Sequence, residues 1–305
     1  MKKHPISVSI VVPNWNGAHL LKKNLPHVLA SAPHAEIIIA DDASVDDSIN
    51  FLKETFPGVI RVENKKQQGF SGNVNSGVAA AHGDIVILLN TDVRPEADFL
   101  APLLARFSDP SIAAVGCLEK SHEDDRVIFR GRGIAKWEKG FFIHSRGEVN
   151  QLDTAWVSGG SSAYRRSVWN MLNGMDTIYN TFYWEDIDLS YQILKSGFRI
   201  GFEPKSIVHH FHEEGKIKTS YTSDQVKRIA YRNQFIFMWK NISDTRVWLD
   251  HCLWMPIRLI QALMRHDMNM IRGYAMVLSK FIYVQSSRAR AASHWKLHDS
   301  DIFSS

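Results

Sequence analysis

Acidic and amide side chains recur at three places in the sequence, each directly after a short apolar run. The three clusters are Asn14–Asn16, Asp41–Asp42 and Asn90–Asp92. Carboxylate and amide oxygens accept hydrogen bonds and bind hard divalent cations such as Mg2+ and Mn2+. Any one cluster alone is equally well explained as the cap of a following helix. Three clusters that each end an apolar run favour a binding site.

The apolar runs and the stretches between them indicate how these side chains are brought together. In chain order the expected elements are strand Ser7–Val12, helix Ala18–Ala30, strand Glu36–Ala40, helix Asp46–Phe56, strand Val59–Val62, helix Ser71–Ala81, strand Asp84–Leu89, helix Glu96–Phe107 and strand Ile112–Cys117. Such alternation predicts βαβ units and a mostly parallel sheet covered on both faces. Ligands of these sheets bind beyond the carboxyl ends of the strands, so the three clusters should converge on one edge.

The pattern changes after Gly116. Arg126–Val149 is rich in Gly, Arg and aromatic residues, which predicts loops and hairpin strands over this edge. The elements expected after it are a small-residue segment Val157–Tyr164, a helix Arg166–Leu172, a helix that opens at Tyr183–Leu189 and ends near Gly197, and strands Arg199–Phe202 and Ser206–His209. The acids of the second helix fall in its first turn, where the helix macrodipole favours negative charge.

The composition excludes several classes of protein. The chain has 305 residues, of which 45% are apolar and 22% charged, as in a soluble globular protein rather than a disordered or collagen-like chain. Its two cysteines, Cys117 and Cys252, are too few and too far apart for a disulfide framework or a cysteine-based zinc site. Neither a secretory signal nor a run of 18 apolar residues is seen. We therefore expect a cytoplasmic protein without a spanning helix.

The last part of the chain differs in composition from the rest. From Tyr221 onward there are twelve Lys and Arg but six Asp and Glu, a net charge of +6, whereas the whole chain carries +4. Its apolar residues near helical spacing include Trp248, Leu249, Leu253, Trp254, Ile257 and Ile260. A basic helix with Trp at its apolar boundary is typical of membrane-surface binding, although packing on the protein core or on a second subunit explains the pattern equally well. The dispersed basic residues argue against nucleic acid.

Seven segments, taken in order, resemble family 2 glycosyltransferases, and most closely the bacterial rhamnosyltransferase-like branch. They are SIVVPNWNG, IIIADDAS, NKKQQGFSGNVNSG, DIVILLNTDV, VSGGSSAYRR, FYWEDIDLSYQILKSGFRI and SIVHH. The resemblance runs from Ser7 to His210. It implies an α/β fold of the GT-A type, with a Rossmann-like, mostly parallel mixed sheet flanked by helices. We expect residues 1–220 to form this domain and residues 221–305 to form a helical C-terminal extension.

The resemblance implies that one group of residues binds the nucleotide. In similar enzymes the residue matching Asp42 accepts a hydrogen bond from the pyrimidine ring, and an ionised carboxylate suits a ring N–H donor. Pro13 and Asn16 would shape the pocket for the base and ribose, and Gly69 and Asn75 would lie against the nucleotide. The alternatives stay open: Asp42 also fits a helix cap, and the segment from Gly69 to Asn75 also fits a turn that starts a helix.

The resemblance also implies a cation site. Asn90-Thr91-Asp92 stands where this fold carries its D-x-D motif, so Asp92 would bind Mg2+ or Mn2+ beside the diphosphate. Asn90 departs from the acidic form of the motif, and its amide would hold a water or the ribose. The family places a histidine after a later strand, and its pattern points to His209 as a second metal ligand, with His210 as the alternative. Together with His212 these histidines also resemble a zinc cluster, but no Cys or H-E-x-x-H accompanies them.

The catalytic prediction concerns the acids Glu185 and Asp186. Displacement at an anomeric carbon needs a base that removes the proton of the acceptor hydroxyl, and a partly buried carboxylate is suited to this. In similar enzymes the second acid of the pair is the base, which favours Asp186 over Glu185; the alternative is that both only stabilise the helix start. Gly160 would line the floor under the donor sugar, although close strand packing also explains it.

These observations predict an inverting, metal-dependent glycosyltransferase. It would move a sugar from a UDP- or dTDP-linked donor to a hydroxyl of a saccharide or lipid-linked saccharide in cell-surface polysaccharide synthesis. We expect the tail to contact the inner face of the cell membrane or to form a homodimer. A non-catalytic nucleotide-sugar-binding protein is the alternative. A dinucleotide-dependent oxidoreductase is disfavoured because Pro13–Gly17 replaces G-x-G-x-x-G after the first strand.

Overall fold

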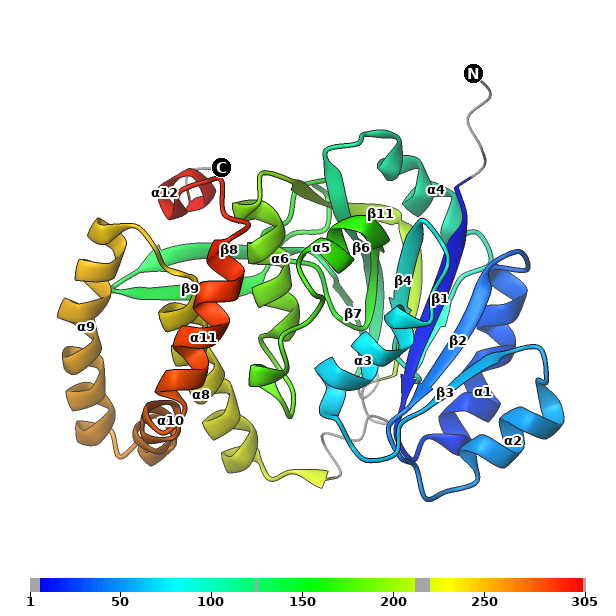
Figure 1. The fold of residues 1–305 in the computed structure, drawn as a ribbon, viewed down its shortest axis with the longest axis horizontal. Helices are drawn as coiled ribbons and strands as arrows, with labels where there is room; N and C mark the ends of the chain where they lie inside the picture. The colour runs from blue at the N-terminus through cyan, green and yellow to red at the C-terminus, as the bar shows by residue number, and fades with distance from the viewer. Residues whose placement is uncertain (1–5, 124–125, 212–219, 304–305) are drawn as a thin grey trace.

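A central sheet of nine strands organises the computed structural model, which describes residues 6–123, 126–211 and 220–303 (Figure 1). Its strands are β1 (Val8–Asn14), β2 (Glu36–Asp41), β3 (Ile60–Glu63), β4 (Ile85–Leu89), β5 (Val93–Pro95), β6 (Ile112–Glu123), β7 (Arg126–Arg130), β10 (Ser161–Arg165) and β11 (Arg199–His210). A separate hairpin consists of β8 (Gly133–Glu138) and β9 (Phe141–Arg146). The α/β class predicted from the alternating elements is confirmed.

The sheet is mixed. The order is β3-β2-β1-β4-β10-β6-β11-β5, with β7 beside β6. Strands β3, β2, β1 and β4 are parallel, and β6 pairs in parallel with β11. Strand β10 runs antiparallel between β4 and β6, and β5 runs antiparallel to β11. The carboxyl ends of β1, β2 and β4 therefore share one edge, as their polar ends predict.

Helices cover both faces of the sheet. They are α1 (Ala18–Ser31), α2 (Ser48–Thr55), α3 (Gly69–Ala79), α4 (Leu100–Ala105), α5 (Arg166–Met171) and α6 (Glu185–Lys195). One apolar core joins α1, α2 and α4 to the sheet through side chains such as Leu25, Leu52 and Leu103. A second core joins α3, α5 and α6 to the opposite face, with Val78 and Trp169 among its members. Burial on both faces explains why the central strands are almost continuously apolar.

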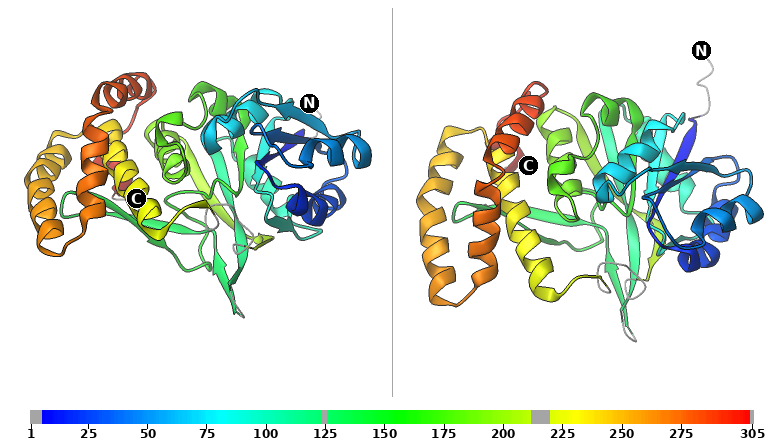
Figure 2. Two further views of the ribbon diagram at one scale, coloured as in Figure 1. Left: turned by 90° about the horizontal axis from the view of Figure 1, so that it is seen from below. Right: turned by 60° about the horizontal axis from the view of Figure 1, so that its bottom comes forward.

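The tail forms a third layer beside α6. Its helices are α8 (Ser223–Asn241), α9 (Thr245–Met264), α10 (Met268–Leu278), α11 (Phe281–Ala292) and α12 (Asp299–Phe303). Figures 1 and 2 both show α6 between the sheet and these helices. A third core joins Phe235 and Phe237 of α8 to Ile187 and Tyr191 of α6 and to Phe142 of the β8–β9 hairpin. The tail is thus packed on the element that carries the candidate base.

Several elements differ from the sequence prediction. The small-residue segment 157–164 includes most of β10, whose side chains are buried between β4 and β6. The two strands expected at 199–202 and 206–209 are one strand, β11, with a register shift between Glu203 and Ile207. The short strand β5 was not expected.

None of the helices in the described ranges has the length and hydropathy needed to cross a bilayer. Cys117 and Cys252 are both free.

Candidate active site

The carboxyl ends of β1 and β2 form the first part of the site. Asn14 donates from Nδ2 to Asp41 Oδ1 over 2.7 Å, and the Ser44 hydroxyl and backbone N–H also donate to Asp41. Asn16 accepts a hydrogen bond of 2.8 Å from the backbone N–H of Val45. Pro13 is half-buried and is the second-last residue of β1, close to the same edge of the sheet. Asp41 therefore ties the end of β1, where Pro13 lies, to Ser44, whose hydroxyl accepts a hydrogen bond from the Asn16 N–H.

Asp42 is buried beside them and holds the start of α3. Its Oδ1 accepts a hydrogen bond of 2.7 Å from the Gln68 N–H, and its Oδ2 accepts one of 3.0 Å from the Gly69 N–H. Gly69 has φ of +73°, and a Cβ there would lie 2.7 Å from Asn180 Cγ. Only glycine fits both demands without displacement of Asn180. The structure thus brings two of the predicted nucleotide-binding residues, Asp42 and Gly69, into direct contact.

Asn75 lies farther along α3 and contacts the protein rather than the open edge. Its Nδ2 donates to the Met175 carbonyl over 2.7 Å, and its Oδ1 accepts from the Met175 N–H over 3.0 Å. The amide is therefore used to join α3 to the turn before the next helical segment. Direct contact of Asn75 with a nucleotide stays a prediction.

The backbone of Gly159 and Gly160 lies between the carboxyl end of β4 and the first turn of α6 and is hydrogen-bonded to both. The Asn90 N–H donates to the Gly160 carbonyl over 3.0 Å, and the Gly159 N–H donates to Asp186 Oδ2 over 3.1 Å. A Cβ at Gly160 would lie 2.5 Å from Asn90 Nδ2. The glycines therefore allow Asn90 and Asp186 to flank one narrow strip. Asn90 Oδ1 is buried and, among the described residues, has no hydrogen-bond partner.

His210, and not the predicted His209, lies beside Asp92. His210 Nε2 is 3.4 Å from Asp92 Oδ1, and its Nδ1 is 3.5 Å from Glu119 Oε2. Burial disfavours the imidazolium, but the hydrogen bonds to Asp92 and Glu119 outweigh it and raise the pKa of His210 to about 10. Glu119 in turn accepts a hydrogen bond from the Ser161 hydroxyl. Asp92 and His210 thus form a buried pair at the site edge.

His209 points to the other face of β11, because successive side chains of a strand alternate. Its Nδ1 is 2.9 Å from His122 Nε2, and its Nε2 is 3.1 Å from Glu96 Oε1. His209 is thus turned away from Asp92, and the alternative named from the sequence, His210, lies beside it; which histidine binds a metal stays a prediction. His212, the third histidine of the run, lies outside the described residues.

Glu185 and Asp186 begin α6 in two different environments. Glu185 is 5% exposed, and its Oε2 has no hydrogen-bond partner among the described residues. Burial, followed by the charge of Asp186, raises the pKa of Glu185 to about 8. Asp186 is half-buried, and burial raises its pKa although the N–H groups of Gly159 and Ile187 oppose the shift. Asp186 is thus oriented by two N–H donors while it keeps access to the site, as a general base requires.

The family is decided by the chain's match to a known family model. The model of "Glycosyl transferase family 2" matches residues 9–172, which is more than half of the chain. The chain belongs to glycosyltransferase family 2. This match covers β1 to α5 and includes the ends of β1, β2 and β4.

Among known proteins, this family 2 chain is similar to the "O-antigen chain rhamnosyltransferase RfbN" of Salmonella typhimurium strain LT2. The two are 23% identical over 212 residues, which span 68% of this chain and 67% of the relative. Among solved structures it resembles GalNAc-T7 with UDP, GalNAc and Mn2+, at a TM-score of 0.58 and 18% identity. The likeness covers 78% of this chain but 48% of GalNAc-T7, so this chain spans about half of that structure.

A second solved structure matches nearly the whole family 2 chain, tail included. It is the mannosyltransferase PcManGT from Pyrobaculum calidifontis in complex with GDP-Man and Mn2+. The TM-score is 0.57 at 16% identity, and the likeness covers 95% of this chain and 87% of that chain. These likenesses confirm the GT-A fold.

The residues around Asp92 fit a divalent cation. Asp92 and Asn90 supply oxygen donors, and His210 supplies a nitrogen donor once a bound cation displaces its proton, a set that suits Mn2+ or Mg2+. The unpartnered Asn90 Oδ1 is a buried acceptor on the same loop. In the part of the chain that the structure describes, no three His, Cys, Asp or Glu side chains are grouped to hold a metal ion. The family 2 site therefore offers a partial set of ligands.

Sequence reasoning missed three residues of this family 2 site or its support. Glu119 directly follows the apolar run Ile112–Leu118 of β6, and Asn233 and Lys240 flank the apolar run Phe235–Trp239 of α8. The available signal was only that each polar residue adjoins a buried apolar run, where a polar group needs a partner. Lys240 donates to Asp176 Oδ2 over 2.8 Å and to Asp188 Oδ2 over 2.7 Å.

Proposed function

We propose that the protein transfers a sugar from a nucleoside-diphosphate donor to a hydroxyl of a saccharide or lipid-linked saccharide, with inversion at the anomeric carbon. The observation that carries the proposal is the Gly159–Gly160 strip, whose Gly159 N–H binds Asp186 and whose Gly160 carbonyl binds the N–H of Asn90, two residues before Asp92. A base and a separate cation site are what a single displacement needs. The relative RfbN is named a rhamnosyltransferase and PcManGT a mannosyltransferase, and both structural neighbours were solved with UDP or GDP-Man and Mn2+.

The donor would bind along the ends of β1, β2 and β4. Pro13, Asn16, Asp42, Gly69 and Asn75 would surround the nucleoside, and Gly160 would lie under the sugar. Asn90, Asp92 and His210 would face the diphosphate. A divalent cation held by Asp92 and His210 would neutralise the charge that develops on the leaving diphosphate.

Asp186 would perform the proton transfer. The acceptor oxygen bonds to the anomeric carbon while the bond from that carbon to the diphosphate oxygen breaks, and the acceptor proton passes to Asp186. Because one displacement inverts the carbon, no covalent sugar–enzyme intermediate is needed. The hydrogen bonds from Gly159 and Ile187 would keep the carboxylate oriented during this step.

The test is nucleotide release from UDP-, dTDP- and GDP-sugars, with Mn2+ or with a chelator. We test dTDP-rhamnose first, because a relative is named a rhamnosyltransferase. Metal-dependent release, with product NMR that gives an inverted anomeric centre, supports the proposal. A retained centre overturns the mechanism. Tight nucleotide-sugar binding without release from any donor favours the alternative, a non-catalytic binding protein.

We also propose that α9 lies on an anionic membrane surface at the inner face of the cell membrane. A stripe of exposed apolar side chains runs along this helix: Leu249, Leu253, Ile257, Ile260, Leu263 and Met264. The exposed Arg246 and Arg265 stand at its two ends. Such a stripe with flanking arginines suits a lipid interface, where anionic headgroups attract the basic residues. A homodimer through the same stripe is the competing outcome.

A further inference from the structure

The turn that precedes α6 is held by side chains of α8, which lies about fifty positions later in the sequence. Asn233 donates from Nδ2 to the carbonyls of Tyr179, Phe182 and Tyr183, over 2.9, 3.0 and 2.7 Å. Arg232 donates from Nη2 to the carbonyls of Tyr179 and Asn180, over 3.0 and 2.5 Å. Two adjacent side chains of the tail thus bind four of the five backbone carbonyls from Tyr179 to Tyr183.

These contacts are buried and mutually ordered. Asn233 is 0% exposed and Arg232 is 6% exposed. Arg232 Nε donates to Asn233 Oδ1 over 2.8 Å, which fixes the orientation of the amide so that its N–H groups face the turn. Because a buried carbonyl without a partner is costly, the turn depends on these donors for its conformation.

The turn needs such support because its last two residues have unusual backbone angles. Tyr183 has φ of +71° and Trp184 has φ of +77°. Residues with side chains rarely adopt this left-handed region, and they keep it only where the surroundings enforce it. Trp184 is the residue before Glu185, so its conformation sets the direction in which α6 begins and where Asp186 stands.

We propose that Asn233, oriented by Arg232, is a positioning residue for Asp186. The contact chain runs from the Asn233 amide to the Tyr183 carbonyl, through Trp184, to the first turn of α6. Loss of the amide releases the left-handed turn and moves Asp186 away from the Gly159 N–H. This inference rests on the proposed function, because it assigns Asp186 as the base.

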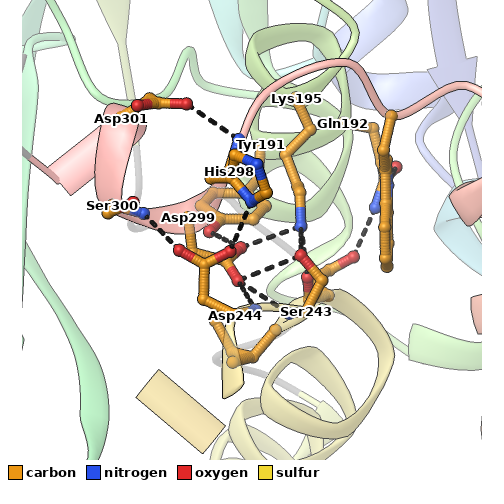
Figure 3. Close-up of polar contacts among 12 residues, drawn as sticks. Tyr191, Gln192, Lys195, Ser243, Asp244, His298, Asp299, Ser300 and Asp301 are labelled. Carbon is orange, nitrogen blue, oxygen red and sulfur yellow. Dashed lines mark hydrogen bonds and ion pairs between the residues drawn. The ribbon is translucent and has the colours of Figure 1, made fainter. Parts of the chain in front are cut away.

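The other end of α6 offers a matched control. There Lys195 donates to Asp299 Oδ1 over 2.9 Å, and Tyr191, Ser243 and the Asp244 N–H also donate to Asp299 (Figure 3). Lys195 and Asp299 are both 0% exposed. This network also joins the tail to α6, but it meets the helix at Tyr191 and Lys195, about 1.4 and 2.5 helical turns after Asp186. Asp299→Asn therefore disturbs the same tail–α6 interface without touching the turn.

The experiment compares Asn233→Ala with Asp299→Asn, each assayed at temperatures well below its own Tm. The readouts are kcat for nucleotide release from the UDP-, dTDP- or GDP-sugar that the unaltered protein uses, Kd for Mn2+–UDP, and hydrogen exchange of backbone amides. We expect Asn233→Ala to lower kcat at least tenfold, to leave Kd within twofold, and to speed exchange over residues 179–188. Asp299→Asn should keep kcat within threefold and speed exchange near residues 191–195 and 243–244.

Two results overturn the inference. One is an unchanged kcat in Asn233→Ala; the other is an equal loss of kcat in both variants, which indicates a purely structural role. If Asn233→Ala does not fold, Arg232→Lys gives the same readouts, with a loss of kcat at unchanged Kd expected. If the unaltered protein releases no nucleotide, the proposed function fails by that result alone. Unchanged exchange over residues 179–188 in the variant then overturns the positioning role separately.

Discussion

Asp186 and Glu185 are adjacent in sequence but have different surroundings, and the difference separates their roles. Asp186 accepts two backbone hydrogen bonds and is half-buried, whereas Glu185 is buried with an unpartnered oxygen. We predict that Asp186→Asn lowers nucleotide release by about 100-fold or more, because general-base assistance is lost. Mn2+–UDP binding should stay within twofold, which isothermal titration calorimetry checks. Near-normal turnover would move the base to Glu185 or remove it altogether.

Glu185 should make the stability of the protein depend on pH. Burial and the Asp186 charge raise its folded-state pKa to about 8 from an ordinary value of 4.5. Between these values the folded state binds more protons than the unfolded state, so the free energy of unfolding falls as pH rises from about 4.5 to about 8. We predict that Glu185→Gln raises Tm more at pH 8 than at pH 5, as measured by thermal melts. An equal Tm change at both values would contradict this origin.

His210 and His209 allow a paired test of the cation site. His210 lies 3.4 Å from Asp92, whereas His209 contacts His122 and Glu96. We predict that His210→Ala weakens UDP binding in Mn2+ at least tenfold and leaves binding in chelator unchanged, since loss of a ligand acts through the metal. His209→Ala, the control, should bind Mn2+–UDP within twofold of the unaltered protein. The same loss in both variants would rule out His210 as the ligand.

At the level of elements, local patterns predicted the parallel half of the sheet well. The apolar runs at β1, β2 and β4 and the polar residues at their ends follow from burial on both faces and from ligand binding at strand ends. The pairing of β10 could not be predicted, because its small residues are buried by strands distant in sequence. The sequence also left open whether His209 or His210 lies beside Asp92, for a similar reason. Neighbouring residues of a strand face opposite sides, and register depends on distant partners.

The buried Lys240 of α8 gives a prediction about the stability of the protein, because it binds a carboxylate of α6. Lys240 is 3% exposed and binds both Asp176 and Asp188, and the nearby charges raise its pKa despite the larger opposing effect of burial. We predict that Lys240→Met destabilises the protein by about 3–5 kcal/mol, because two carboxylates lose their shared cation. Urea unfolding measures the change. Lys296→Met, at an exposed position, should change stability by less than about 1 kcal/mol.

At the scale of the whole molecule, the tail combines an inner face that supports α6 with an outer apolar stripe on α9. Leu253 is 64% exposed and Met264 is 77% exposed. We predict that the protein floats with anionic vesicles at low salt, and less at high salt. The double variant Leu253→Glu and Ile260→Glu should not float, whereas Val127→Glu, on β7, should float normally. Absence of flotation, together with a stable dimer by light scattering, would contradict the membrane proposal.

The composition of the tail predicted its helices but not the direction of its side chains. The net charge of +6 and the helical spacing are properties of the sequence. Trp239, however, is buried and donates to His251 Nε2, so it is not part of an outer surface. Which apolar side chains face out depends on packing against α6, and single-helix patterns do not contain that information. The division of the chain at residues 220 and 221 stays a prediction.

The contacts of α8 also set an order of events during biosynthesis. A ribosome releases the chain from its N-terminus, so Asp186 leaves the exit tunnel well before Asn233 and Lys240 do. Until then Asp188 has no cation to balance it and the turn at Tyr183 has no donors for its carbonyls. The sheet can assemble early, but the nascent chain cannot complete its catalytic end before α8 emerges. An mRNA that lacked the codons from α8 onward would therefore yield a chain in which Asp186, the proposed base, lacks the contacts that hold its turn.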